Sequence, residues 1–183
     1  KAYLDGFSPN VQEILDKFEF RNQIRTMVDA DILGAVIEKF TSSDINLSPK
    51  PGKLPGLDNH GMGTIFEELI RRFNEENNEE AGEHWTPRDV VELMADLAFY
   101  PVEDQIKDAT YSCYDGACGT GGMLTVAQAR LLKLAAKQRK KVSIHLFGQE
   151  INPETYAICK ADMLLKGDGE EAEHIAYGSI LFS

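Results

Sequence analysis

A regular alternation of strand and helix signals over residues 111–177 restricts this chain to few folds. Two runs have the length and apolar pattern of strands, Tyr111–Asp115 and Val142–Gln149, and Ile175–Tyr177 carries a shorter strand signal. Helical spacing follows each of the first two runs, and Pro153 marks the start of the second helix. Strand, helix, strand, helix order predicts parallel strands joined by right-handed crossovers. We therefore expect an α/β fold with a Rossmann-like layer.

Residues 1–80 show helical periodicity without strand signals, so we expect a separate helical N-terminal domain there. A Pro/Gly-rich stretch, Ser48–Gly56, predicts a loop within it. The acidic, Asn-rich run Asn74–Glu80 is the best candidate boundary, which leaves residues 81–183 as the second domain. The shared helix faces are Val11, Ile14, Leu15 and Phe18; Ile32, Leu33, Val36, Ile37 and Phe40; and Ile65, Phe66, Leu69, Ile70 and Phe73.

The second domain opens on a sequence typical of a helix start. Thr86 is the expected N-cap, Pro87 suits the first turn because its missing N–H costs nothing there, and Asp89 occupies the capping-box position. The buried face expected for this helix is Val90, Leu93, Met94 and Leu97. The face expected for the helix after the first strand is Leu124, Ala127, Leu131 and Leu134.

Composition limits the classes of function. A chain of 183 residues with 43% hydrophobic content can bury a core, no run reaches the roughly 18 apolar residues of a membrane span, and we expect a cytoplasmic protein. The formal charge, 19 − 30 = −11, has the wrong sign for neutralising phosphates unaided. The basic residues Lys137 and Arg139–Lys141 fit a solvated connection better than a phosphate contact.

The cysteines indicate no metal centre. Cys113, Cys118 and Cys159 are odd in number and form no C-x-x-C pair, so we expect reduced, partly buried thiols and no structural zinc.

The strongest chemical signal is the glycine-rich turn Asp115–Gly122, where a strand passes to a helix. Glycines let the backbone approach a ligand closely, and the helix N-terminus offers unpaired N–H groups. An NAD fingerprint would place a third small residue at position 124, where Leu124 stands. An acidic strand end such as Asp115 suits a cationic ligand, and S-adenosylmethionine carries a sulfonium, an ammonium and no phosphate.

Two further segments complete the predicted ligand site. Glu150 ends the next strand, where a carboxylate can accept hydrogen bonds from both ribose hydroxyls, as acidic residues do in nucleotide-binding α/β folds. The segment Glu83, His84, Trp85, Thr86, Pro87 and Arg88 leads into another helix N-terminus, a plausible seat for a carboxylate. A plain capping box, with His84 and Trp85 in a core or interface, is the other interpretation of that segment.

These segments resemble a known family. The strings 82–88, 115–122 and 148–152 are similar, in order, to three cofactor motifs of the methyltransferase (M) subunit of type I restriction-modification systems, which are DNA adenine-N6 methylases. The segments 7–10 and 65–73 resemble the helical N-terminal domain of that family. The resemblance implies transfer of a methyl group from S-adenosylmethionine to adenine N6 by direct displacement.

The resemblance also implies roles for individual residues. Thr86 with Glu83, His84, Trp85, Pro87 and Arg88 would take the carboxylate end of the cofactor. Asp115 with Gly119, Thr120, Gly121 and Gly122 would contact the methionine moiety, and Glu150 the ribose. Two positions depart from the family pattern, since Gly116 replaces a usual proline and Ser179 replaces an aspartate that often meets the adenine amine.

The family's catalytic Asn/Asp-Pro-Pro-aromatic motif does not occur in these 183 residues, and Asn152-Pro153-Glu154 is a poor imitation. We therefore expect no catalytic residue here and no activity from this chain alone. The strand expected to flank Tyr111–Asp115 on its other side would lie beyond Ser183, so we expect the natural chain to continue. The implied partners are DNA, a DNA-specificity subunit, a restriction subunit and a second M subunit.

Other functions remain open at this point. The chain could be a non-catalytic module that binds cofactor while residues 1–80 dock on a specificity subunit. An NAD-dependent oxidoreductase fits less well because of Leu124, and a cytosine-C5 methyltransferase would need Cys118 to reach a base from inside the turn. Cytosine-N4 enzymes share the same front motifs, and only the longer resemblance favours adenine.

Overall fold

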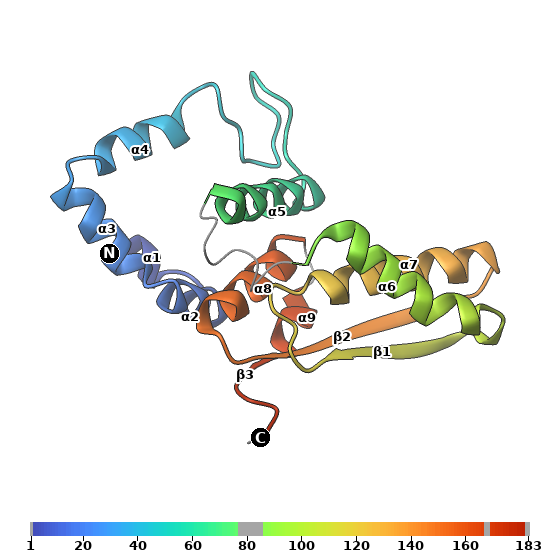
Figure 1. The fold of residues 1–183 in the computed structure, drawn as a ribbon. Helices are drawn as coiled ribbons and strands as arrows, with labels where there is room; N and C mark the ends of the chain where they lie inside the picture. The colour runs from blue at the N-terminus through green and yellow to red at the C-terminus, as the bar shows by residue number, and fades with distance from the viewer. Residues whose placement is uncertain (1, 77–85, 167–168, 182–183) are drawn as a thin grey trace.

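The fold is given by a computed structural model that describes residues 2–76, 86–166 and 169–181 (Figure 1). Within these ranges the N-terminal part is helical, and strands enter only after residue 108. The helices are α1 (Ala2–Asp5), α2 (Pro9–Lys17), α3 (Phe20–Asp29), α4 (Leu33–Thr41), α5 (Asn59–Glu76), α6 (Arg88–Phe99), the 3-10 helix η2 (Tyr100–Gln105), α7 (Gly122–Lys137), α8 (Pro153–Lys166) and α9 (Gly169–Glu173).

The strands form a three-stranded sheet in the order β1-β2-β3. They are β1 (Ala109–Asp115), β2 (Val142–Glu150) and β3 (Ile175–Tyr177), and both pairings are parallel. The predicted parallel order is confirmed, although β1 begins two residues before the expected Tyr111. Among the described residues β1 pairs only with β2, so one edge of β1 is open.

The main core lies between the sheet and the helices on one of its faces (Figure 1). Helix α7 packs on β1 and β2, and α8 packs on β3 and β2 as well as on α5, α2 and α9. Along β2 the buried residues alternate with partly exposed ones, as expected when one face of a strand is covered. Complete burial of side chains such as Leu124 and Leu146 stabilises the fold by about 1.5–3 kcal/mol each. The apolar face predicted for α7 is confirmed, with Leu124, Leu131 and Leu134 buried and Ala127 half-buried.

Helix α8 begins where the sequence predicts. The Asn152 side-chain oxygen accepts hydrogen bonds from the backbone N–H groups of Glu154 (2.9 Å) and Thr155 (3.2 Å), which satisfies two donors of the first turn. Pro153 occupies the first helical position, where a backbone donor is not needed. The resulting helix buries Tyr156, Cys159 and Met163.

Helix α6 differs from the prediction in its start and in its buried face. Pro87, with extended backbone, is the N-cap, and no side chain caps the helix, so the expected Thr86 cap is wrong. The helix is in contact with α7 and buries the small residues Val91 and Ala95. The apolar residues expected to be buried are exposed in the described structure: Val90, Leu93, Met94 and Leu97.

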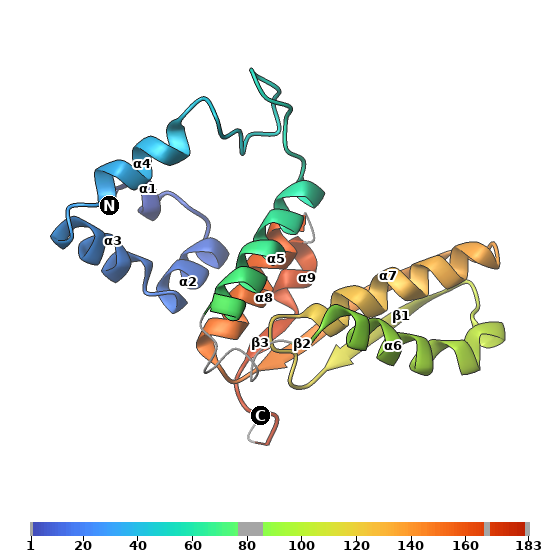
Figure 2. The same ribbon diagram turned by 45° about the horizontal axis from the view of Figure 1, so that its top comes forward.

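Helix α2 packs on α8, whereas α3 and α4 extend away from the sheet, and the chain returns through the loop before α5 (Figure 2). Ile14 is the buried residue of α2, while α3 and α4 have none. Helix α5 lies across α8, and a Cβ atom added at Gly63 would approach Lys166 Cγ to 2.8 Å, so the two helices meet closely. Helix α5 continues to Glu76, so the first part of the predicted boundary Asn74–Glu80 is helical and the rest lies outside the described residues.

Helix α9 supports the sheet through one carboxylate, that of Glu171. Strand β3 pairs with β2 only from Gly148 to Glu150, and the Glu171 side chain accepts a hydrogen bond from the backbone N–H of Leu146 just before that segment. Glu171 also contacts His145 Nδ1 at 3.0 Å and His174 Nδ1 at 3.4 Å. A side chain therefore continues the hydrogen bonding of β2 where β3 does not reach.

The connection from α7 to β2 contains the basic run. Residues 139–141 are exposed, and Arg139 has a left-handed backbone (φ 58°) while the Lys140 N–H bonds to Ala135 O. This confirms the prediction of a solvated connection. No helix in the described ranges is long and apolar enough to cross a membrane.

Candidate functional site

The glycine-rich turn between β1 and α7 is tied to the neighbouring strand by backbone donors. The Cys118 N–H donates to Gln149 O (3.0 Å), and the Gly119 N–H donates to Glu150 Oε2 (2.8 Å). Asp115 Oδ1 accepts the Ala117 N–H at 3.1 Å, which shapes the start of the turn. The turn is thus held on one side by the last residue of β1 and on the other by the end of β2.

Two glycines in this turn need the left-handed region of backbone conformation. Gly119 has φ 54° and Gly121 has φ 83°, and Gly121 is the N-cap of α7. Residues with a side chain adopt this region at a cost, so the predicted use of glycine is explained by the turn itself. A Cβ atom at Gly121 would also lie 2.7 Å from Cys159 Sγ, so Gly121 allows α8 to approach the turn.

Glu150 is fixed by two backbone donors. Its Oε1 accepts the Asn152 N–H (2.7 Å), and its Oε2 accepts the Gly119 N–H. Each carboxylate oxygen can accept more than one hydrogen bond, so these contacts orient Glu150 and leave acceptor capacity for a ligand. The group is half-buried, with its position set by the turn and by the start of α8.

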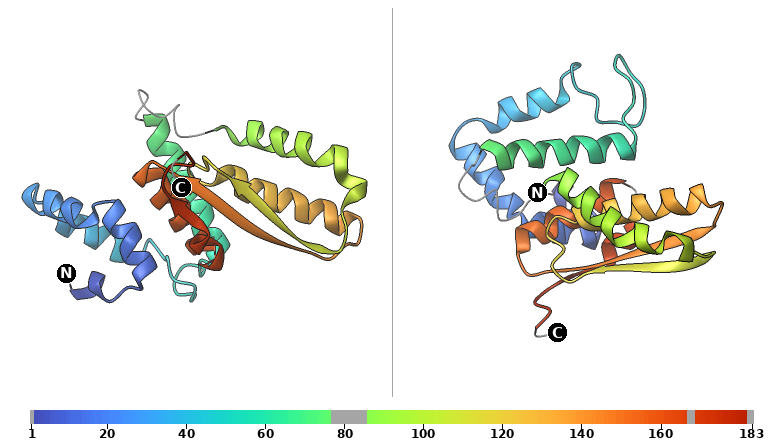
Figure 3. Two further views of the ribbon diagram at one scale, coloured as in Figure 1. Left: turned by 90° about the horizontal axis from the view of Figure 1, so that it is seen from below. Right: turned by 45° about the vertical axis from the view of Figure 1, so that its right-hand side comes forward.

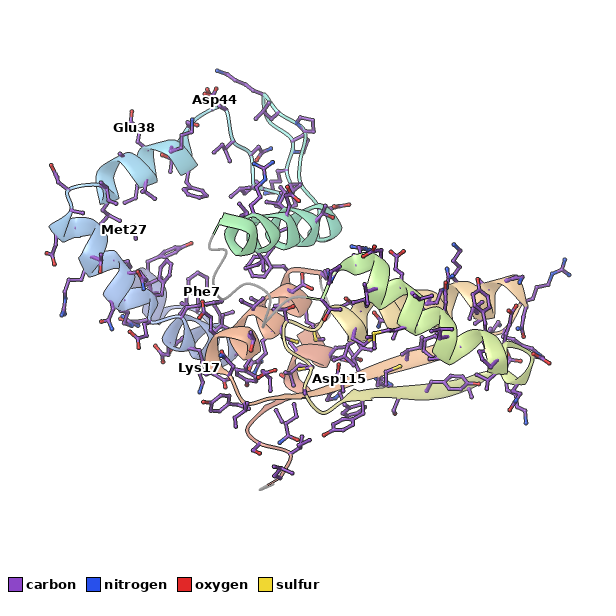
Figure 4. The ribbon with its side chains drawn as sticks, viewed as in Figure 1. Phe7, Lys17, Met27, Glu38, Asp44 and Asp115 are labelled. Carbon is purple, nitrogen blue, oxygen red and sulfur yellow. The ribbon has the colours of Figure 1, made fainter. Side chains whose placement is uncertain are left out.

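The strand ends bring the predicted acidic residues to one edge of the sheet. In the register, Glu150 is opposite Tyr177, so β2 and β3 end together, and β1 ends at Asp115, opposite Gly148 of β2. Figure 4 shows Asp115 where β1 leaves the sheet for the turn. Because the turn after Asp115 bonds to Glu150, the two carboxylates flank the same turn.

The turn leaves space on its outer side. A Cβ atom at Gly119 or at Gly122 would meet no atom within 4 Å, in contrast to the filled position beside Gly121. The N-terminus of α7, a helix of 16 residues, begins at Gly122 and contributes partial positive charge and N–H donors. Two carboxylates, open glycines and a helix N-terminus fit a ligand that carries both a cationic and an anionic group.

The segment before α6 is only partly described. Glu83, His84 and Trp85 lie outside the described residues, and Thr86 is exposed. Arg88 forms an ion pair with Glu92 at 3.3 Å. The first turn of α6 also borders a cavity of about 600 Å³, lined by residues of α5, α6, α7 and α8 that include neither Asp115 nor Glu150. That cavity is therefore distinct from the edge of the sheet where the predicted carboxylates lie.

The two buried cysteines near the turn are structural. Cys159 shares a hydrogen bond with Cys118, and this contact together with burial raises the pKa of the Cys159 thiol. Burial also raises the pKa of Cys113. All three thiols are free, as predicted. Cys118 is buried within the turn, which gives no support to a nucleophile that attacks a base. The described residues contain no cluster of side chains suited to a metal ion.

The contacts at the end of β3 were not predicted from the sequence. The Gly178 N–H donates to Glu150 O (3.0 Å), and Ser179 Oγ accepts the Leu181 N–H at 3.2 Å, so Ser179 shapes the following turn. Tyr177 lies beside Glu150 in the register and contacts Lys17 of α2. No periodic signal links residue 17 to residue 177, so sequence reasoning missed this pair.

Comparison with known proteins supports the resemblance. The chain is 33% identical over 104 residues to the methylase subunit of the type I restriction enzyme MpnII from Mycoplasma pneumoniae, a match covering 57% of this chain and 17% of that protein. It is 27% identical over 161 residues to the EcoEI methylase subunit from Escherichia coli, covering 86% and 29%. It is 28% identical over 180 residues to the type II restriction enzyme and methyltransferase RM.BcgI from Heyndrickxia coagulans, covering 93% and 27%. The chain thus spans less than a third of each of these relatives.

Among solved structures, the methyltransferase subunit of a type I restriction-modification system from Streptococcus thermophilus matches with a TM-score of 0.46 and 28% identity, covering 66% of this chain and 24% of that one. A sequence model of the N-6 DNA methylase family matches residues 57–183, which are most of the chain. The protein belongs to the N-6 DNA methylase family.

Proposed function

We propose that the edge formed by the ends of β1 and β2 binds S-adenosylmethionine, and that the chain is the front part of a Rossmann-like methyltransferase. The observation that carries the proposal is the hydrogen bond from the Gly119 N–H to Glu150 (2.8 Å), which places the glycine turn between two acidic strand ends. Asp115 suits the cationic amino-acid part of the cofactor, and Glu150 suits its ribose hydroxyls. The exposed side chain of Ile151, next to Glu150, offers an apolar surface for the purine.

The remaining contacts follow the same geometry. Gly119, Thr120, Gly121 and Gly122 would line the methionine part, with the α7 N-terminus beside its carboxylate. Thr86 and its neighbours in the segment 83–88 would complete that end. When bound, the cofactor supplies an electrophilic methyl group, and this chain binds and orients it.

The family relation suggests the reaction of the whole protein. We infer that it methylates adenine N6 in DNA as the M subunit of a type I restriction-modification system, because several relatives are methylase subunits of type I restriction enzymes. DNA, a specificity subunit, a restriction subunit and a second M subunit are the proposed partners, and the cytoplasm is the proposed location. The net charge of −11 supports delivery of DNA by another subunit.

A binding and assembly role for this chain has its own supporting observation. Helices α3 and α4 bury no residue, and they expose Val28, Ile37 and Phe40. Exposed apolar helix faces favour docking of the N-terminal helices on a specificity subunit, with cofactor bound and no turnover by this chain.

The binding proposal is tested by calorimetric titration of the protein with S-adenosylmethionine and, separately, with NAD. We expect the protein to bind S-adenosylmethionine. Glu150→Gln should weaken this binding by about tenfold, because charge-assisted hydrogen bonds to the ribose are lost. Glu154→Gln is the matched control, since Glu154 is exposed in the first turn of α8. Binding of NAD without any response to S-adenosylmethionine would refute the proposal.

The expectation that this chain alone is inactive is tested by an assay of methyl transfer to DNA in the presence of a specificity subunit. We expect no product from these 183 residues, because the Asn/Asp-Pro-Pro-aromatic motif is absent from them. Methylated adenine would contradict the claim that essential residues are missing.

A further inference from the structure

We propose that Lys17, on α2 of the N-terminal helical region, is a positioning residue for the nucleoside end of the cofactor site, acting through Tyr177. The proposal rests on the proposed S-adenosylmethionine site and extends it to a part of the chain that the family match, residues 57–183, does not include. It starts from an unexpected proximity, since Lys17 Nζ lies 3.5 Å from the centre of the Tyr177 ring.

Tyr177 occupies the position in the sheet that matters for a ribose or a purine. It is the last residue of β3 and is opposite Glu150 in the parallel register. Directly after Tyr177, the Gly178 N–H donates to Glu150 O. The backbone next to Tyr177 is therefore joined to Glu150, the residue proposed to bind the ribose. The ring is about half exposed, and its orientation is therefore set by a few contacts.

Two contacts hold that ring. The Tyr156 ring of α8 lies 5.4 Å from it, centre to centre, with an interplanar angle of 54°. The Lys17 ammonium is placed over the ring, an arrangement stabilised by the negative face of the aromatic system. One contact comes from α8 and the other from α2, so the Tyr177 ring contacts both of these helices.

Helix α2 is anchored well enough to place Lys17. One turn before Lys17, Glu13 accepts hydrogen bonds from Lys160 Nζ (2.9 Å) and from the Tyr156 hydroxyl (2.8 Å). Lys160 also donates to the Tyr156 hydroxyl at 3.2 Å and is only 4% exposed, whereas the Glu13 side chain is partly exposed. Asn10 adds a third contact, to Glu173 at 3.2 Å.

The arrangement is visible in several views. Helix α2 lies next to α8 in Figure 1 and in both panels of Figure 3, while α3 and α4 point away from the sheet. Figure 4 shows Lys17 where α2 meets the sheet domain, and Asp115 at the end of β1. The N-terminal helical region thus reaches the cofactor edge through α2, on the side of β3 and away from the glycine turn.

The test compares ligand affinities of the wild-type protein with those of Lys17→Met, which keeps the length and apolar stem of the side chain and removes its charge. We expect Lys17→Met to weaken the binding of S-adenosylmethionine and of 5′-methylthioadenosine by about threefold to fivefold, because one exposed cation–ring contact is lost. Lys17→Arg should restore the affinity, because a guanidinium also stacks on an aromatic ring. Lys39→Met, an exposed lysine of α4, is the matched control and should bind as the wild type does.

A second pair of variants separates positioning from general stability. Tyr177→Phe keeps the ring face and should keep the affinity for S-adenosylmethionine. Tyr177→Leu removes the ring and should lower that affinity as much as Lys17→Met does. Titrations run well below the melting temperature of every variant exclude unfolding as the cause.

The outcomes are distinguishable. If the wild type binds S-adenosylmethionine and Lys17→Met binds it equally well, the positioning role is wrong while the cofactor site stands. If Lys39→Met weakens binding as much as Lys17→Met, a general charge effect replaces the specific contact and the role is again wrong. If the wild type binds neither nucleoside, the proposed function itself fails, and the role of Lys17 fails with it.

Discussion

At the level of single residues, the glycine turn gives a sharp stability prediction. Gly121→Ala should lower the free energy of unfolding by about 2–4 kcal/mol, because a side chain at φ 83° is strained and its Cβ would lie 2.7 Å from Cys159 Sγ. Gly122→Ala, one residue later in the first turn of α7, should leave stability within about 0.5 kcal/mol, since no atom lies within 4 Å of its Cβ position. Urea unfolding of both variants measures the difference. Equal losses in the two variants would contradict the geometry of the turn.

The cysteines allow a second prediction at this level. Native protein treated with iodoacetamide at mildly alkaline pH should keep Cys118 and Cys159 unmodified, because both are buried and the pKa of Cys159 is raised by its contact with Cys118 and by burial. Addition of denaturant should expose all three thiols to reaction. Mass spectrometry after digestion identifies which cysteines are alkylated, and rapid native alkylation of Cys159 would be inconsistent with this packing.

The same residues show what sequence reasoning can and cannot reach. The places of Asp115, Glu150 and the glycines at strand ends and in the turn were predicted because these elements are encoded in neighbouring positions, while their role in binding a ligand stays a prediction. Thr86 was wrongly predicted as an N-cap, since Pro87 itself takes the extended N-cap conformation and the helix starts at Arg88. Tyr177 and Lys17 were missed because their contact joins positions 160 residues apart and follows only from the packing of α2.

At the level of elements, α9 acts mainly through Glu171. Burial opposes its ionisation, but hydrogen bonds from the Leu146 N–H, His145 and His174 outweigh this effect and lower the pKa of Glu171. A lowered pKa means that its contribution to stability is complete above its ordinary value of 4.5 and is lost as pH falls through the pKa of the folded state.

We therefore expect Glu171→Ala to cost about 1–3 kcal/mol near neutral pH, because it leaves the Leu146 N–H without an acceptor. The difference from the wild type should shrink on the acid side of pH 4.5. Glu170→Ala, at the exposed neighbouring position, is the control. Urea unfolding across this pH range is the measurement, and a difference that does not change with pH would refute the ionic role.

Elements with a clear period were predicted best. The bounds of β2 were predicted within one residue from its alternating pattern, and the buried face of α7 was predicted from its apolar spacing. The buried face of α6 was predicted wrongly: the helix buries the small residues Val91 and Ala95 and leaves its larger apolar residues exposed. Periodicity shows that a helix has an apolar face, but the neighbouring element decides which side is covered.

At the level of the whole molecule, burial is unevenly distributed. The core joins the sheet, α7 and α8, whereas α3 and α4 contain no buried residue. Hydrogen exchange should therefore be fast in α3 and α4 and slow in β2, α7 and α8. Uniform protection along the chain, measured by mass spectrometry, would contradict this distribution. The division into a helical part and an α/β part was predictable from the change of period, but the attachment of the two through Glu13 and Lys160 was not.

The unpaired edge of β1 should affect the hydrogen exchange of individual amides in this strand. In a parallel pair, successive N–H groups of a strand point alternately toward the partner and away from it, and β2 is the partner of β1 among the described residues. Every second amide of this strand therefore has no strand partner among the described residues, although the strand is fully formed. In a deuterium-exchange NMR experiment, the amide signals of alternate residues in the range 109–115 would disappear quickly, and those of the residues between them would disappear slowly.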